Sequence, residues 1–98
     1  MLIHIVCWKY KPDIDEHARE EHRARLRALP DVIAGIEAFD VGADILHLER
    51  SFHTGLVAHF ADRAALDHYT DHVDHQAVAA IGRQLAETVV SVDFFQPE

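Results

Sequence analysis

The sequence has little that could cross-link the chain or hold it in a membrane. Its only cysteine, Cys7, lies inside an apolar run and has no second thiol to pair with, which favours a reducing, cytoplasmic location. No apolar stretch reaches the roughly 18 residues that a membrane-spanning helix needs. The N-terminus also lacks a basic flank followed by an apolar signal core, so we expect neither a signal peptide nor a membrane span.

Basic residues are scarce as well. Nine lysines and arginines stand against 17 aspartates and glutamates, which gives a net charge of −8 with histidine neutral. A surface of this sign repels phosphate groups, so we expect no nucleic-acid partner. The arginines between residues 19 and 27 are interleaved with glutamates, a pattern typical of a solvated helix face rather than of a binding patch.

The chain does contain enough apolar material for one core. Hydrophobic residues make up 49% of its 98 residues, which suffices for a single domain over residues 1–98 without disulfides or a structural metal. Apolar runs predict strands at residues 2–9, 36–41, 54–60 and 88–95. Helical spacing predicts a helix at residues 15–29, ended by Pro30, and two short helices or one broken helix over residues 61–70 and 74–87.

The order of these elements, β-α-β-β-α-β, is the split βαβ arrangement of a ferredoxin-like fold. We therefore expect an α+β protein with a four-stranded antiparallel sheet and its helices on one face. The strands are apolar on both faces, whereas a sheet with one solvated face should alternate. No predicted helix remains to cover the second face. The sequence thus predicts a homodimer in which a second copy covers the open face of the sheet.

Residues 66–75, LDHYTDHVDH, concentrate side chains that titrate or hydrogen-bond near neutral pH. They hold three of the nine histidines, a tyrosine and three aspartates. Such a cluster is costly to bury and unnecessary for folding, so it is the first place to look for chemistry.

The three histidines of this cluster, His68, His72 and His75, are spaced i, i+4 and i+7, roughly along one helical face. This spacing is compatible with a divalent metal ion such as Zn²⁺. It is also compatible with a polar helix end at which His72 caps the backbone. We favour the second interpretation and assign no metal, because no ligand from a strand accompanies the three histidines.

Four segments of the chain occur in an order typical of one family. They are residues 3–12 (IHIVCWKYKP), 54–60 (TGLVAHF), 64–75 (AALDHYTDHVDH) and 90–94 (VSVDF). In turn they resemble the first strand with its Lys-Pro turn, the third strand, the ALxxYxxHPxH segment and the closing strand of the stress-responsive A/B barrel domain family, the dimeric α+β barrels. The chain has Val73 and Asp74 where that family usually has proline and a small residue.

The resemblance implies a candidate active site. Most members of the family are uncharacterised or tied to stress tolerance, and one plant member is a polyketide cyclase that closes an aromatic ring by aldol condensation without a cofactor. The residues that matter there are a first-strand histidine, a tyrosine and the last histidine of Tyr-x-x-His-x-x-His. These positions fall on His4, Tyr69 and His75.

The resemblance also suggests residues that contact a substrate. His22 and Leu26 fall where the cyclase has aromatic and phenolic pocket residues. His72 and Asp74 precede the last histidine of the segment, His75. These four are the expected substrate-binding residues.

Three kinds of function remain open. The first is a cofactor-free acid–base enzyme, polyketide cyclase-like or isomerase-like, acting on a small carbonyl compound. In it His4 would be the general base or proton shuttle, His75 its paired acid–base and Tyr69 a hydrogen-bonding anchor. The second is a non-catalytic dimeric stress-response protein, and the third is a dimer that binds a small ligand or a metal.

Overall fold

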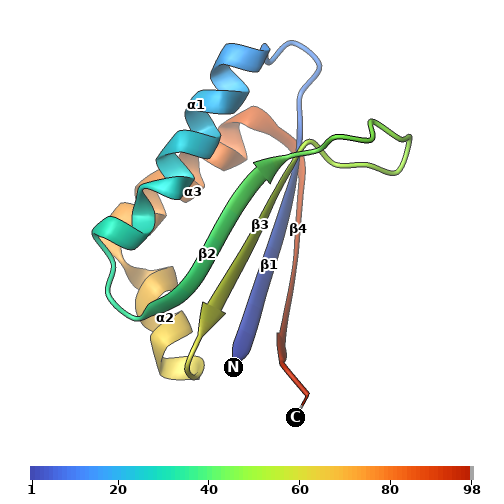
Figure 1. Ribbon diagram of the computed structural model, residues 1–98. Coiled ribbons are helices and arrows are strands. Elements are labelled where there is room, and N and C mark those ends of the chain that lie inside the picture. Colours follow the sequence, from blue (N-terminus) through green and yellow to red (C-terminus); the bar gives the residue numbers. More distant parts are fainter. Residues whose placement is uncertain (98) are drawn as a thin grey trace.

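The computed structural model describes residues 1–97 as a layer of helices on a layer of strands (Figure 1). The strands are β1 (Leu2–Tyr10), β2 (Ile36–Ala43), β3 (Thr54–Phe60) and β4 (Ala86–Phe95). The helices are α1 (Glu16–Arg27), the short 3-10 helix η1 (Leu29–Asp31), α2 (Arg63–Asp71) and α3 (Val73–Leu85). None of these helices is long and apolar enough to cross a membrane.

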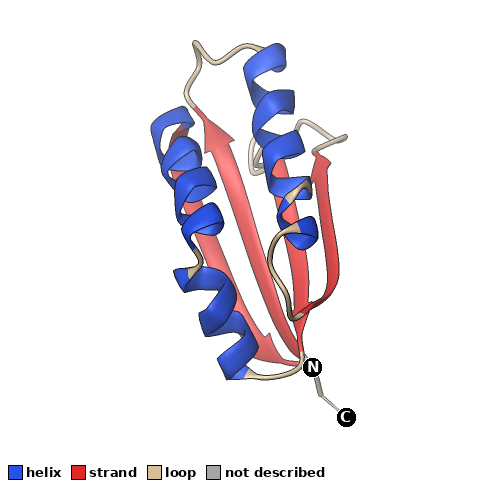
Figure 2. Ribbon diagram, turned by 90° about the vertical axis from the view of Figure 1, so that its left-hand side faces the viewer, coloured by secondary structure: helices blue, strands red, loops and turns tan. Residues whose placement is uncertain are grey.

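The sheet has the strand order β2-β3-β1-β4, and every neighbouring pair is antiparallel. The helices all lie against one face of it, as the two views show (Figures 1 and 2). This confirms the predicted ferredoxin-like α+β topology. Because β1 lies between β3 and β4, its side chains on the helix face point to the middle of the space between the two layers.

Short polar side chains set where the helices begin. Asp15 accepts a hydrogen bond from the Ala18 amide at the start of α1, and Asp62 accepts one from the Ala65 amide at the start of α2. Both are N-caps, which satisfy amides that have no partner inside the helix. The first helix ends at Arg27, two residues before the predicted boundary, because the chain tightens into η1 around Pro30.

The second helical region is two helices, and the break falls at His72. The backbone of His72 is extended, with φ −63° and ψ 137°, and its Nδ1 accepts a hydrogen bond of 3.1 Å from the Asp74 amide. His72 therefore caps α3, as the polar-helix-end interpretation predicted. The break also means that His68, His72 and His75 do not share one continuous helical face, contrary to the expectation from their spacing.

The core lies between the helices and the sheet. Tyr10, Leu56 and Phe60 from the strands and Leu26 and Tyr69 from the helices are each at most 3% exposed. This layer holds most of the buried apolar area that stabilises the chain.

The other face of the sheet is apolar and uncovered in the single chain. In the strand register, Ile5 lies opposite both Val57 and Val92, so the three side chains form a row across β3, β1 and β4. Val92 is 53% exposed, and Phe94 beside it is 42% exposed. The prediction of strands that are apolar on both faces is thus confirmed.

Candidate active site

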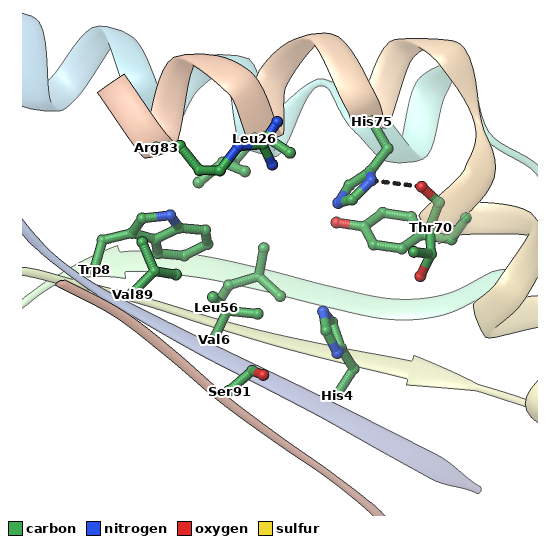
Figure 3. Close-up of a pocket in the computed structure, with 12 residues that line it drawn as sticks. His4, Val6, Trp8, Leu26, Leu56, Thr70, His75, Arg83, Val89 and Ser91 are labelled. Atoms are coloured by element: carbon green, nitrogen blue, oxygen red, sulfur yellow. Dashed lines mark hydrogen bonds between the residues drawn. The ribbon is translucent and has the colours of Figure 1, made fainter. Parts of the chain in front are cut away.

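A cavity of about 220 Å³ lies between the sheet and the helices (Figure 3). Its lining comes from all three long helices and from three strands, namely His4, Val6, Trp8, Leu26, Leu56, Tyr69, Thr70, His75, Ala79, Arg83, Val89 and Ser91. Three of the predicted site residues, His4, Tyr69 and His75, therefore meet in one cavity, and Leu26 joins them.

His4 reaches the cavity from the middle of β1. Its Nδ1 lies 2.5 Å from Oδ1 of Asp93, its direct partner on β4. A carboxylate only accepts hydrogen bonds, so Nδ1 is the donor and carries the proton. In the neutral imidazole the other ring nitrogen, Nε2, then holds a lone pair, and Figure 3 shows a nitrogen of His4 directed into the cavity. His4 can therefore accept a proton from a bound molecule.

His75 reaches the same cavity from the first turn of α3. Its Nδ1 lies 3.0 Å from the backbone oxygen of Thr70, which also can only accept (Figure 3). Burial lowers the pKa of His75, and the hydrogen bond to Thr70 only partly offsets this. His75 is thus neutral near pH 7, with the proton on Nδ1 and a lone pair on Nε2.

Tyr69 lies between the two imidazoles. Its ring centroid is 6.0 Å from that of His4 and 4.4 Å from that of His75. The side chain is 1% exposed, and burial raises the pKa of its hydroxyl, so the group stays protonated. No other group within residues 1–97 hydrogen-bonds this hydroxyl, which leaves its proton available to an oxygen of a ligand.

The structure places His22 outside the cavity lining, contrary to the expectation from the resemblance. It is 1% exposed, and its Nδ1 lies 2.6 Å from the Tyr10 hydroxyl, which in turn lies 2.9 Å from Oγ1 of Thr54. The His22 ring stands edge-on to Trp8, with centroids 5.2 Å apart. Trp8 thus lies in the cavity wall, and His22 belongs to a buried polar network that supports it.

His22 is also unusual electrostatically. Its Nε2 is buried and has no hydrogen-bond partner within residues 1–97. Burial lowers the pKa of His22 to about 4, and the charge of Arg23 contributes in the same direction. His22 is therefore neutral at physiological pH.

The other two expected substrate-binding residues also lie outside the lining. His72 is occupied in capping α3, and Asp74 lies in the exposed first turn of that helix. Residues 1–97 contain no group of three or more His, Cys, Asp or Glu side chains arranged to hold a metal ion. Among the lining and supporting residues that the sequence did not single out, three carry polar groups that bear on the chemistry, namely Trp8, Arg83 and Asp93.

The fold and the cavity together define a ferredoxin-like α+β domain with a two-histidine pocket on its helix side. Residues 2–96 match the model of the Stress Responsive A/B Barrel Domain, and the chain belongs to this family. No protein of curated function matches the chain in sequence.

Several solved structures share the fold. A dimeric ferredoxin-like protein of unknown function from Thermobifida fusca is 25% identical over 95% of this chain and 88% of that one, with a TM-score of 0.86. A hydroxynitrile lyase from Passiflora edulis is 16% identical over 99% and 94%, with a TM-score of 0.89. A Dabb family protein from Mesorhizobium loti is 23% identical over 99% and 97%, with a TM-score of 0.82. The last two similarities establish the fold alone.

Proposed function

We propose that the protein is a cofactor-free acid–base enzyme that removes a proton from carbon beside a carbonyl group of a small molecule. The observation that carries this proposal is the convergence of His4, Tyr69 and His75 on one cavity. Each imidazole has its Nδ1 proton held by an oxygen of the protein, so in its neutral form each offers a lone pair on Nε2.

The chemistry follows from these three groups. Nε2 of His4 takes the proton from carbon, and the carboxylate of Asp93 stabilises the imidazolium that forms. The electron pair moves onto the carbonyl oxygen, which accepts a hydrogen bond from the Tyr69 hydroxyl. His75 then returns or relays a proton to complete the turnover. Ring closure of the polyketide cyclase kind and isomerisation both begin with this deprotonation.

A purely structural role fits the geometry less well. In a protein with only a structural role, we would expect a filled interior and a His4 side chain hydrogen-bonded to the backbone. Instead His4 bonds a carboxylate and borders an open cavity. The hydroxynitrile lyase from Passiflora edulis is an enzyme with this same fold, which supports catalysis on this scaffold.

Deuterium exchange tests the proposal without knowledge of the natural substrate. The probe is 2-hexanone in D2O, a neutral ketone with an apolar chain, and exchange at its α-carbons is followed by proton NMR. We expect the wild-type protein to accelerate exchange, and His4→Ala and His75→Ala each to lower that acceleration about 100-fold. His17→Ala, on the exposed face of α1, is the matched control and should keep the wild-type rate. Equal rates in all four proteins would contradict the proposed mechanism.

We also propose that two copies of the chain pair through the open face of the sheet. The row of Val57, Ile5 and Val92 supports this, because exposed apolar rows of this kind mark protein–protein contacts. The protein from Thermobifida fusca that shares this fold is dimeric.

A further inference from the structure

The two ends of the cavity differ in chemistry. His4 and His75 stand at one end and Trp8 stands at the other, with apolar side chains such as Leu56 between them (Figure 3). Arg83 enters from the Trp8 side, and its guanidinium group extends over the space between the two ends (Figure 3). The proposed acid–base chemistry uses only the histidine end. Trp8 and Arg83 therefore take no part in the proposed reaction.

The guanidinium group of Arg83 is not paired with a carboxylate of residues 1–97. It is exposed at the edge of the cavity and makes no ion pair within residues 1–97. On the preceding turn of α3 it has Ala79 and Ala80, so no side chain there could neutralise it. Four other arginines are each held by a neighbouring carboxylate: Arg23, Arg25, Arg27 and Arg63. The charge of Arg83 also reaches the histidine end, where it adds to the effect of burial in lowering the pKa of His75.

Trp8 supplies an unpaired donor on the side from which Arg83 enters. The residue is 7% exposed and lines the cavity, and its indole N–H makes no hydrogen bond within residues 1–97. Gly82 of α3 passes close to this nitrogen, because a Cβ at position 82 would come within 2.9 Å of it. An N–H in a cavity wall that has no protein partner can donate a hydrogen bond to a ligand oxygen.

The charges at the two ends also favour one orientation of a ligand. Asp93 stands behind His4 and repels an anion, whereas Arg83 attracts one on the side away from Asp93. A molecule with one negative group would bind with that group toward Arg83. Its remaining atoms would then extend along the apolar wall toward the two histidines.

We propose that the cavity takes a small carbonyl compound that bears a carboxylate, and that Arg83 and the Trp8 N–H bind this carboxylate while the carbonyl lies at the two histidines. Guanidinium and N–H donors match a carboxylate in charge and geometry. A volume of about 220 Å³ limits the ligand to a small acid, below the roughly 300–1,000 Å³ that holds drug-sized molecules. The position of the carbonyl rests on the proposed function, whereas the carboxylate site does not.

Binding of 3-oxohexanoate and of its neutral analogue 3-oxohexanamide tests the carboxylate site. Trp8 is the only tryptophan of the chain, so its fluorescence reports on the cavity directly. We expect the wild-type protein to bind the acid about tenfold more tightly than the amide at low salt. Arg83→Gln should remove this preference and leave the affinity for the amide unchanged, and Arg83→Lys should retain part of it. Arg50→Gln, an exposed loop arginine outside the cavity, is the matched control and should bind as the wild type does.

The assignment is overturned by equal affinities of the wild type for acid and amide, by no detectable binding of the acid, or by an unchanged preference in Arg83→Gln. The outcome is independent of the catalytic proposal. His75→Ala should lose deuterium exchange on 2-hexanone, which has no carboxylate, and still prefer 3-oxohexanoate over its amide. A protein that prefers the acid but never exchanges the ketone would support the site and count against the enzyme.

Discussion

Oδ1 of Asp93 lies 2.5 Å from Nδ1 of His4, although the two residues are 89 positions apart in the chain. They meet because β1 and β4 are antiparallel neighbours in which position 4 faces position 93. The carboxylate holds the Nδ1 proton and so keeps the lone pair of His4 on the nitrogen that faces the cavity. It would also stabilise the imidazolium that forms when His4 accepts a proton.

Asp93→Asn should therefore slow deuterium exchange on 2-hexanone by at least about tenfold while leaving the affinity for the ketone unchanged. The amide has the shape of the carboxylate but lacks its charge, so it stabilises the imidazolium less. NMR exchange rates at several ketone concentrations separate the rate from the affinity. Asp71→Asn, at the exposed end of α2, is the control. A wild-type rate in Asp93→Asn would mean that the charge of Asp93 plays no part in the chemistry.

The Asp93–His4 pair shows where sequence reasoning reached its limit. The topology and the two-sided apolar strands could be predicted, because periodicity along the chain encodes them. Positions 4 and 8 share one face of a strand, because successive side chains alternate between the two faces. The partner of His4 could not be predicted, because it depends on the register between strands at opposite ends of the sequence. The only signal was an aspartate inside an apolar strand.

His22 illustrates a second limit. The resemblance placed His22 at the pocket. How closely a helix packs against the sheet depends on tertiary contacts, which cannot be derived from the sequence alone. α3 comes close to Trp8 and His22 because it has a glycine there, Gly82. His22 is thereby enclosed behind the cavity wall. Arg83 was missed for a simpler reason, since an arginine on a helix surface is usually solvated.

Gly82→Ala should destabilise the protein by about 1–3 kcal/mol, because the added methyl group overpacks this contact. Its Cβ would lie 2.9 Å from Nε1 of Trp8 and 3.0 Å from Nε2 of His22. At an exposed helical site the same substitution would instead stabilise by about 1 kcal/mol, so the sign of the effect is diagnostic. Urea denaturation gives the free energy of unfolding.

The exposed Ala80 on the same helix provides the comparison. Ala80→Gly should cost about 1 kcal/mol through helix propensity alone and leave the fluorescence of Trp8 unchanged. Gly82→Ala should shift that fluorescence. An increase in stability in Gly82→Ala would show that α3 does not pack closely on Trp8 and His22.

The buried His22 should make stability fall as the pH is lowered. Its pKa is about 4 in the folded protein and about 6.5 in the unfolded chain, so between these values the unfolded state binds more protons. Stability is therefore greatest above pH 6.5 and decreases toward pH 4, by about 3 kcal/mol from this residue. Urea denaturation at several pH values measures the slope.

His22→Gln is the matched variant for this pH dependence. Glutamine can bond the Tyr10 hydroxyl but does not titrate, so the slope between pH 6.5 and pH 4 should become shallower even if stability at pH 7 falls. Burial also lowers the pKa of His75 and His53, so part of the slope should remain. An identical slope in His22→Gln and the wild type would show that His22 is solvated and titrates normally.

Val92→Glu should convert a dimer into monomers. Val92 is 53% exposed in the single chain and lies in the row with Ile5 and Val57, so a glutamate there would place an unpaired charge at the centre of the proposed interface. Light scattering at micromolar concentration should give twice the 11.1 kDa mass of one chain for the wild type and a single mass for Val92→Glu. Val32→Glu, at a 56% exposed site next to η1, should remain dimeric. A wild-type protein with the mass of one chain would leave the apolar row in contact with solvent, and pairing through the sheet would have to be abandoned.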